Sequence, residues 1–283
     1  MAETESPDLP HTILRVTADN PGPMTFRGTN SYVFGDETSC CILDPGPDIG
    51  AHLEALDRAV AGRRVEAILL THRHGDHSGL VTQAMARFGA PLLAAPSPER
   101  PYQASVDFGR LHADRALAHG NRLDLAGHAV DVVATPGHTS DHLAFALPEH
   151  GVLFSGDHVM GWSTTVVIPP DGSMRAYRES LRILLGRSDR LFLPGHGDAI
   201  ARPRRLVRSI LAHRRQREAM ILRELRKGPG TVQDLVGRLY PGIGEALAVA
   251  AGFSVRAHLA EMIENGAIEG PDPVLSDGAF SAK

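Results

Sequence analysis

The sequence lacks the features that mark disulfide-stabilised and membrane-spanning proteins. Its two cysteines, Cys40 and Cys41, are adjacent. Neighbouring strand residues point to opposite faces of a sheet, so we expect buried free thiols rather than a disulfide. No apolar run approaches the ~18 residues needed to cross a membrane. Segment 1–8 is acidic and has no apolar centre of the kind found in export signals, so we expect a cytoplasmic protein without a membrane partner.

Aromatic residues are also scarce, at 5% of the chain, with a single tryptophan, Trp162. Stacking of bases on aromatic rings is a common way of holding single-stranded nucleic acid, so this scarcity disfavours binding of that kind. The formal net charge is −4, yet segment 202–227 carries ten Lys or Arg against two Glu. This segment could grip a polyanion such as RNA. It could equally be a solvated helix or a dimer face, and the sequence leaves these alternatives open.

Segment 71–80 has the highest density of metal-capable side chains. They are His72, His74, Asp76 and His77, and they follow the apolar run 65–70, which is typical of a short buried strand. In an extended turn His72 and His74 can point to one side, while Asp76 and His77 open the next helix and can face a second point. Imidazole and carboxylate together favour zinc, and iron or manganese are compatible with the same ligands. The segment therefore predicts two metal ions sharing one site.

Three later strands are expected to end in a glycine-containing turn that carries one more metal-capable residue. These residues are His138 after 129–134, Asp157 after 152–154 and His196 after 191–193. Short apolar runs alternate with helical periods and hairpin turns along this part of the chain. We therefore predict a mixed α/β (α+β) fold with two sheets covered by helices, an αββα sandwich.

The composition changes beyond residue 199. We predict a long helix over 202–227 that Gly228-Pro229-Gly230 ends, a capping box at Thr231 that opens a short helix, and a third helix over 253–264. With the strand-like segment 267–269, these elements favour a winged-helix-like module. The predicted domains are 1–200 for the catalytic domain, 201–270 for this module and 271–283 for a disordered tail.

The motif H-x-H-x-D-H formed by residues 72–77, followed by His138, Asp157 and His196, resembles the metallo-β-lactamase superfamily, with all seven ligands in the family's order. The resemblance implies that His72, His74 and His138 hold the first metal ion, that Asp76, His77 and His196 hold the second, and that Asp157 bridges them. It also implies the αββα fold of that superfamily.

The implied chemistry is hydrolysis at two divalent metal ions, most favourably Zn²⁺. Seven ligands for two ions leave open coordination positions, which is typical of a catalytic site. Cations roughly 3.5 to 4 Å apart can hold a bridging hydroxide at neutral pH, and Asp76 could relay the proton of the attacking water. His142 and Trp162 are candidates for supporting the ligands or contacting the substrate. We interpret seven other histidines as surface or core residues: His52, His112, His119, His128, His150, His213 and His258.

Within the superfamily the chain resembles the beta-lactamase-like protein 2 group, and the resemblance rests on segments 28–32, 71–79, 135–142, 156–157 and 194–197 and on the terminal module. That group implies hydrolysis of phosphodiesters in single-stranded RNA. The chain departs from the usual motif at Arg73 and Gly75. A thioester, ester or lactone hydrolase similar to glyoxalase II is an alternative, and a nucleic-acid-binding regulator built on the winged helix is another. A homodimer through the C-terminal module is also compatible with the sequence.

Overall fold

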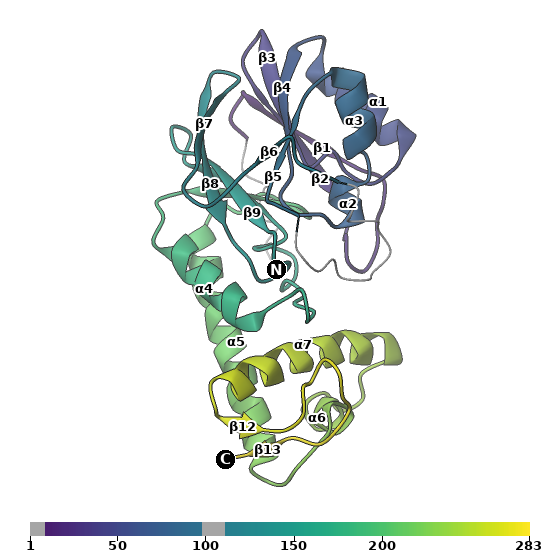
Figure 1. Ribbon diagram of the computed structural model, residues 1–283, viewed down its shortest axis with the longest axis vertical. Helices are drawn as coiled ribbons and strands as arrows, with labels where there is room; N and C mark the ends of the chain where they lie inside the picture. The colour runs from purple at the N-terminus through teal and green to yellow at the C-terminus, as the bar shows by residue number, and fades with distance from the viewer. Residues whose placement is uncertain (1–8, 98–110) are drawn as a thin grey trace. The chain divides into compact units, whose positions relative to one another are not determined.

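The computed structural model describes residues 9–97 and 111–283. The chain divides into two compact units, each traced in Figure 1. The first unit contains the chain up to Thr135, Asp141–Thr164 and Arg187–Pro203. The second unit contains Pro136–Ser140, Thr165–Gly186 and Arg204–Lys283.

The first unit contains two sheets. The six-stranded sheet has the order β1 to β6, antiparallel from β1 to β3 and parallel from β3 to β6. Its strands are β1 (Ile13–Thr17), β2 (Asn30–Gly35), β3 (Ser39–Leu43), β4 (Arg64–Leu69), β5 (Leu92–Ala94) and β6 (Arg115–Ala116). The five-stranded sheet has the order β11-β10-β9-β8-β7, in which only β10 and β11 are parallel. Its strands are β7 (Arg122–Leu125), β8 (His128–Ala134), β9 (Leu143–Leu147), β10 (Val152–Gly156) and β11 (Leu191–Pro194).

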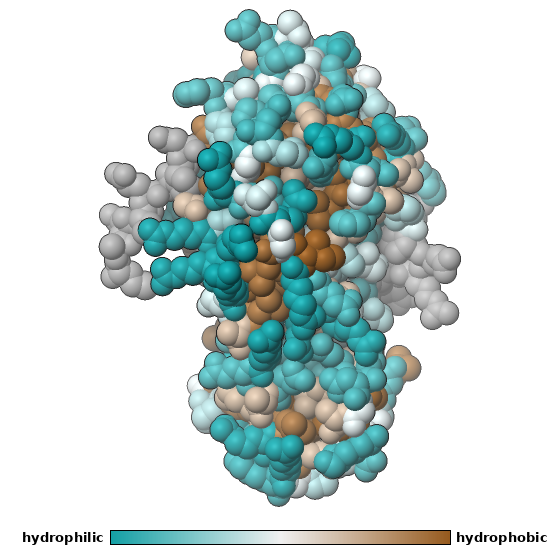
Figure 2. Space-filling view, turned by 90° about the vertical axis from the view of Figure 1, so that its left-hand side faces the viewer, coloured by the Kyte–Doolittle hydropathy of each residue, from teal (hydrophilic) through white to brown (hydrophobic). Residues whose placement is uncertain are grey.

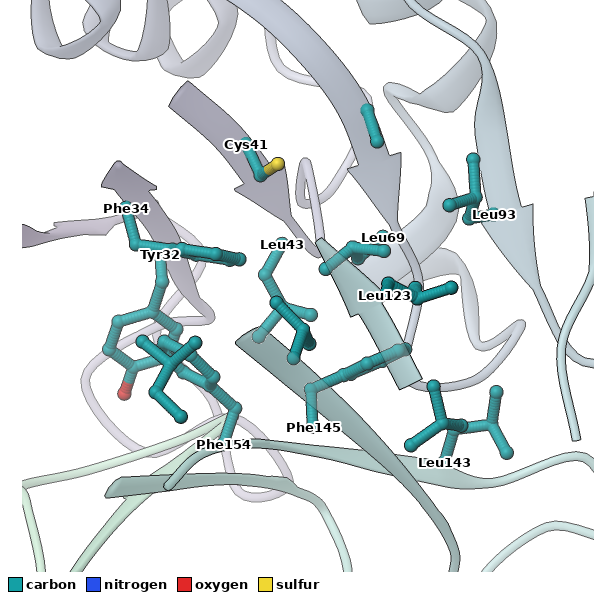
Figure 3. Close-up of a cluster of buried hydrophobic side chains, with 14 of the residues drawn as sticks. Tyr32, Phe34, Cys41, Leu43, Leu69, Leu93, Leu123, Leu143, Phe145 and Phe154 are labelled. Carbon is teal, nitrogen blue, oxygen red and sulfur yellow. The ribbon is translucent and has the colours of Figure 1, made fainter. Parts of the chain in front are cut away.

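Two apolar layers hold the first unit together, and the six-stranded sheet separates them. One face of this sheet packs on the five-stranded sheet through side chains such as Phe34, Leu69, Phe145 and Phe154 (Figure 3). The other face packs under helices α1 (Gly50–Val60) and α3 (Val81–Phe88). Residues of the buried strands alternate between the two layers, as the pleat requires. Cys41 belongs to the layer between the sheets and Cys40 to the layer under the helices, and both are buried free thiols as predicted.

The second unit is mainly helical. Its elements are α4 (Met174–Leu185), α5 (Pro203–Leu225), α6 (Val232–Leu239), α7 (Glu245–Glu264) and the short hairpin of β12 (Ile268–Glu269) and β13 (Ser281–Ala282). Its core combines Ile221 and Leu225 of α5 with apolar side chains of α6, α7 and the hairpin. At the height of α6, α7 and the hairpin, the face shown in Figure 2 is mostly hydrophilic. In the described part of the chain, no helix combines the length and apolar character of a membrane span.

The capping box predicted at Thr231 is confirmed: its hydroxyl accepts from the N–H of Asp234, whose carboxylate accepts from the N–H of Thr231. Other helix predictions differ from the structure. The helix that Asp76 and His77 were expected to open is only the short α2 (Gly75–Ser78), which is separate from α3 because the N–H of Leu80 donates to Gly46 O instead of continuing the helix. Helix α7 starts at Glu245 rather than near 253, because an alanine-rich stretch of high helix propensity extends it.

The two compact units are bounded differently from the predicted domains, which remain a prediction. Helix α4 and the loop 136–140 belong to the second unit, where Arg178 of α4 pairs with Glu218 of α5 at 2.7 Å and with Glu261 of α7 at 3.0 Å. The segment expected to be a disordered tail contains β13 and the fully buried Phe280, which packs in the core of the second unit. Burial of the Phe280 ring, the pairing of β13 with β12 and two backbone hydrogen bonds between Phe280 and Gly230 hold this segment against that core.

Candidate metal centre

The predicted ligands of the first unit lie where parallel strands end. Strands β3 and β4 are parallel, as are β10 and β11, and the chain leaves these strands towards Asp44, the turn 71–77, Asp157 and His196. Parallel neighbours present their carboxyl ends at the same edge of a sheet. The fold therefore gathers side chains that are far apart in the sequence.

Four of these side chains converge closely. Nε2 of His77 lies 3.4 Å from Oδ2 of Asp76 and 3.4 Å from Oδ1 of Asp157. Nε2 of His196 lies 3.2 Å from Oδ2 of Asp76 and 3.3 Å from Oδ2 of Asp157. Tetrahedral ligands of zinc, bound at about 2.0 Å, are about 3.3 Å from one another. The carboxylates and imidazoles are thus spaced like ligands around a cation.

Two hydrogen bonds fix which nitrogen each imidazole offers. Nδ1 of His77 donates to Oδ2 of Asp44 at 2.9 Å, and both side chains are buried. Nδ1 of His196 donates to Gly28 O at 3.2 Å. With Nδ1 donating in each ring, Nε2 faces the carboxylates and is the nitrogen that can bind a metal once its own proton has left.

His72 and His74 form the other half of the predicted site. Nε2 of His72 lies 3.1 Å from Nδ1 of His74, and Nδ1 of His72 lies 3.0 Å from the hydroxyl of Thr71. Ligand atoms of His72, His77 and Asp157 all lie within 4.8 Å of one another. His138 belongs to the second unit, where its Nδ1 donates to Val166 O at 2.6 Å. The role of His138 as a ligand of the first ion remains a prediction.

Two observations test whether a cation fits these residues. The buried Nε2 of His77 makes no hydrogen bond to any described residue. A Cβ placed on Gly195 would lie 2.4 Å from Oδ1 of Asp157 and 2.6 Å from Cε1 of His77. Glycine thus leaves open the space on which the donor atoms converge. The donor set of imidazole and carboxylate fits a divalent transition metal.

The electrostatics of the site fit a cation as well. Burial alone would raise the pKa of Asp76, but His77 and His196 outweigh burial and lower this pKa to about 2. Burial alone would lower the pKa of His196, but Asp157 and Asp76 raise it to about 9. In the same way the two carboxylates raise the pKa of His77 well above its usual value despite burial. Without metal the carboxylates therefore keep protons on these imidazoles, and a bound cation would replace the protons.

Sequence reasoning missed Asp44. Oδ1 of Asp44 accepts a hydrogen bond from the backbone N–H of Thr71 at 2.7 Å, and Oδ2 accepts one from the Thr71 hydroxyl at 2.7 Å. Oδ2 also accepts the hydrogen bond from His77. The available signal was its position directly after a buried strand, which is the same signal that identified Asp157. Asp44 holds both the start of the ligand turn and the ring of His77.

Residues of the segment 28–32 fix the turn that carries His196. Asn30 donates from Nδ2 to Pro194 O at 3.1 Å and to Gly197 O at 2.8 Å. The Tyr32 hydroxyl donates to Pro194 O at 2.8 Å. The segment supported the family resemblance, and these bonds give it a physical role in positioning a ligand.

Arg73 departs from the usual motif and lies between the predicted ligands His72 and His74 in the sequence. Its side chain is buried. Its guanidinium donates to Asp141 at 2.7 Å and to Ala95 O at 2.7 Å. A buried charge is tolerated only when it is paired in this way. The ion pair therefore anchors the turn of His72 and His74 to two distant segments.

His142 and Trp162 had been candidates for supporting the ligands or contacting the substrate. Nε2 of the buried His142 accepts the backbone N–H of Asp157 at 3.2 Å, and its Nδ1 lies 2.8 Å from the hydroxyl of Thr135. His142 thus supports the backbone of a predicted ligand. The Trp162 ring stacks on Phe26 with 4.8 Å between centroids and lies against Gly197, next to His196. A role for Trp162 in substrate binding remains a prediction.

Two known families match the chain. The Metallo-beta-lactamase superfamily matches residues 24–196, which include all seven predicted ligands. The Beta-lactamase associated winged helix domain matches residues 231–269, which cover α6, α7 and β12. The predicted fold class and the predicted C-terminal module are thereby confirmed.

Individual relatives span most of the chain. A Beta-lactamase-like protein 2 homolog of Drosophila melanogaster is 32% identical over 277 residues, which cover 91% of this chain and 90% of the relative. An Atrochrysone carboxyl ACP thioesterase of Aspergillus fumigatus is 32% identical over 226 residues, covering 76% of this chain and 67% of that enzyme. The crystal structure of a metallo-beta-lactamase family protein from Thermus thermophilus matches with a TM-score of 0.77 at 25% identity, covering 96% of this chain and 99% of that one.

Proposed function

The chain belongs to the metallo-β-lactamase superfamily and is a hydrolase, and from this premise we propose that it is a dinuclear metal-dependent hydrolase that cleaves phosphodiester bonds in single-stranded RNA. The observation that carries the hydrolytic site is the convergence of Asp76, His77, Asp157 and His196 at distances of 3.2 to 3.4 Å. Two divalent ions, most favourably zinc and alternatively iron or manganese, would supply Lewis acidity and a water-derived nucleophile at neutral pH.

The chain's own residues divide the remaining tasks. His72, His74 and His138 are proposed to hold the first ion, and Asp76, His77 and His196 the second, with Asp157 between them. The Asp76 side chain is 28% exposed and that of Asp157 is 9% exposed, so Asp76 is the carboxylate that solvent reaches more readily. We therefore assign to Asp76 the acceptance of a proton from the attacking water. Asp44 keeps His77 in the required tautomer throughout.

The exposed arginines of α5 support RNA as the substrate. At 100° per residue, Arg204, Arg208 and Arg215 of α5 project within about 40° of one another. Arg205 and Arg223 lie further round the helix on one side of this group, and Arg226 follows directly after the last residue of α5. All six are exposed. Two further arginines of this segment are committed elsewhere, since Arg214 is buried and Arg217 lies over the Tyr240 ring at 4.5 Å. A stripe of unburied guanidinium groups is suited to phosphates along a strand.

A thioester is the second candidate substrate. The observation that favours it is the Aspergillus fumigatus relative, which is named as a thioesterase and is 32% identical to this chain. The same pair of ions would serve ester-like carbonyls, because Lewis acidity acts on a carbonyl as it does on a phosphoryl group. A purely regulatory winged helix is less favoured. Glu261 and Glu264 on α7 pair with Arg178 and Arg175, so this face of the helix is used for packing rather than for reading bases.

A substrate panel tests the proposal. The purified protein is analysed for metal by emission spectrometry and then assayed on single-stranded RNA, acyl thioesters, lactones and chromogenic phosphodiesters. We expect two ions per chain and cleavage of RNA. If fully metallated protein hydrolyses thioesters but not RNA, the thioester becomes the proposed substrate in place of RNA. Metallated protein that hydrolyses nothing in the panel would contradict both.

A further inference from the structure

A second group of metal-capable side chains lies at the other end of the five-stranded sheet. In the β8–β9 ladder Asp131 pairs with Ala146. Continuing this antiparallel register by three residues places His128 opposite Glu149. The tight turn before β10, in which the N–H of His150 donates to Leu147 O, adds His150 to the same spot. The topology of the sheet thus brings together two imidazoles and a carboxylate.

The three donor atoms are close enough to share one ion. Nε2 of His150 lies 3.4 Å from Nδ1 of His128 and 3.6 Å from Oε1 of Glu149. These separations resemble the roughly 3.3 Å between ligands of tetrahedral zinc. Nδ1 of His128 and Oε1 of Glu149 are closer, at 2.5 Å. The Glu149 side chain is 48% exposed and can rotate outward by the small distance that an ion requires.

The surroundings hold the histidine rings and leave the site accessible. The His128 side chain is 10% exposed, and its ring lies 6.4 Å from that of Phe34. Its Nδ1 faces Nε2 of His150 and Oε1 of Glu149, so Nδ1 is the nitrogen that the ring offers to an ion at this position. The His150 side chain is 26% exposed and lines a cavity of about 710 Å³ together with His11 and Arg190. The partly exposed side chains of Glu149 and His150 leave the position between the three side chains open to water.

We propose that His128, Glu149 and His150 bind a divalent transition metal, with zinc as the preferred ion, at a site distinct from the hydrolytic centre. Two imidazoles, one carboxylate and a water complete a tetrahedral shell of borderline donors. Strand β10 separates this site from Asp157 by roughly 20 Å, given about 3.3 Å per residue. The ion would join the β7–β8 turn to the β9–β10 turn. The site depends neither on the substrate nor on the ions of the hydrolytic centre.

The test compares metal binding by matched variants. Wild-type protein, His150→Ala, Glu149→Gln and the control His112→Ala are stripped of metal, titrated with zinc against a chromophoric chelator, and counted by emission spectrometry at saturation. The control residue is an exposed histidine outside the cluster. We expect His150→Ala to hold one zinc fewer than wild type and Glu149→Gln to bind that ion at least tenfold more weakly. We expect His112→Ala to match wild type.

The difference between variants, rather than the absolute count, decides the result, so incomplete loading of the hydrolytic centre does not confuse it. Hydrolytic activity of His150→Ala and Glu149→Gln should equal that of wild type, and circular dichroism of the stripped proteins confirms folding. An equal zinc count in wild type and His150→Ala would show that the cluster is only an ion pair between His128 and Glu149. Equal losses in His150→Ala and His112→Ala would show adventitious binding by surface histidines. Either outcome overturns the proposal.

Discussion

Oδ2 of Asp44 accepts two hydrogen bonds, one from Nδ1 of His77 at 2.9 Å and one from the hydroxyl of Thr71 at 2.7 Å. One buried carboxylate directly after β3 therefore holds both the start of the turn 71–77 and the predicted ligand His77. The carboxylate does two things for the site. It holds the ring of His77 in orientation, and it keeps the proton on Nδ1 so that Nε2 is free to bind a cation.

Replacing this carboxylate should weaken metal binding without unfolding the protein. In Asp44→Asn one oxygen becomes an amide donor, which no longer selects the Nδ1–H tautomer of His77. We expect the affinity for the second ion to fall by roughly 10- to 100-fold. Chelator competition measures this affinity. The control is Asp48→Asn in the same turn, whose exposed side chain accepts from Gln83 and should not affect the metal. Equal affinities in Asp44→Asn and wild type would contradict the tautomer argument.

Asp157 is predicted to bridge the two ions. Asp157→Ala should abolish hydrolysis and lower the metal content by at least part of the second ion, while the far-ultraviolet circular dichroism stays unchanged. The fold should survive because Asp157 lies on a turn at the edge of a separately packed core. The surface variant Asp124→Ala on β7 serves as the control. Turnover at the wild-type rate in Asp157→Ala would exclude the bridging role.

The exposed arginines of α5 are predicted to bind RNA. Reversing the charge of Arg204, Arg205 and Arg208 should raise KM for RNA, and the salt dependence of cleavage should become less steep, because fewer counterions are released on binding. Hydrolysis of a small uncharged ester should stay unchanged, since that substrate has no phosphates to engage. Kinetics with both substrates at several salt concentrations make the comparison. A parallel loss of both activities would instead assign these arginines a structural role.

Arg214 is expected to support His138, the predicted metal ligand of the second unit. It donates to Thr165 O at 2.5 Å, and the next carbonyl, Val166 O, accepts from Nδ1 of His138. Arg214→Met should loosen this segment and weaken binding of the first ion by roughly tenfold. Arg215→Met changes the exposed neighbour on the same helix and should leave the affinity unaltered. Metal titration of both variants decides, and equal affinities would remove Arg214 from the support of His138.

Buried neutral histidines predict a loss of stability in mild acid. Burial lowers the pKa of His52 to about 4, below the ordinary value near 6.5. The unfolded chain therefore binds a proton between these values that the folded chain does not. The contribution is fully present above pH 6.5 and is lost as the pH falls towards 4, by up to about 3 kcal/mol.

Urea unfolding of wild type and His52→Gln at pH 7 and pH 5 measures this contribution. The stability of wild type should fall more between the two pH values than that of the variant. His258, whose pKa burial lowers to about 3, adds a change of the same sign in both proteins. The difference between them therefore isolates His52, and His112→Gln controls for an exposed histidine. Identical pH dependences in wild type and His52→Gln would contradict the prediction.

The features that the sequence predicted are those determined by residues close to one another in the chain. The ligands of the first unit follow apolar strands and lie in turns that contain glycine, so a short stretch of sequence identified both the strand and the metal-capable residues after it. Thr231 was recognised as a cap because its partner Asp234 is three residues away. In patterns of this kind the interacting residues lie within a few positions of one another, so the sequence alone shows the interaction.

The parts that remained hidden depend on partners far along the chain. Arg73 looked like a departure from the motif because its partner Asp141 lies 68 residues away, and only the folded chain pairs them. Asp44 looked like a turn residue because Asp-Pro-Gly is what many turns contain. Phe280 is surrounded by small residues in the sequence, so nothing nearby indicated the core that it enters. Tertiary context, rather than local propensity, decided each of these cases.

The adjacent thiols Cys40 and Cys41 lie in different layers, one under the helices and one between the sheets. A thiol reagent can reach either sulfur only when the layer around it opens. Burial also raises the pKa of both thiols, which slows reaction in the closed state. Proteins that retain one cysteine or the other would therefore report, by their labelling rates, how often each layer opens on its own. Equal rates would mean that the sandwich opens as one cooperative block, and unequal rates would rank its layers by local stability.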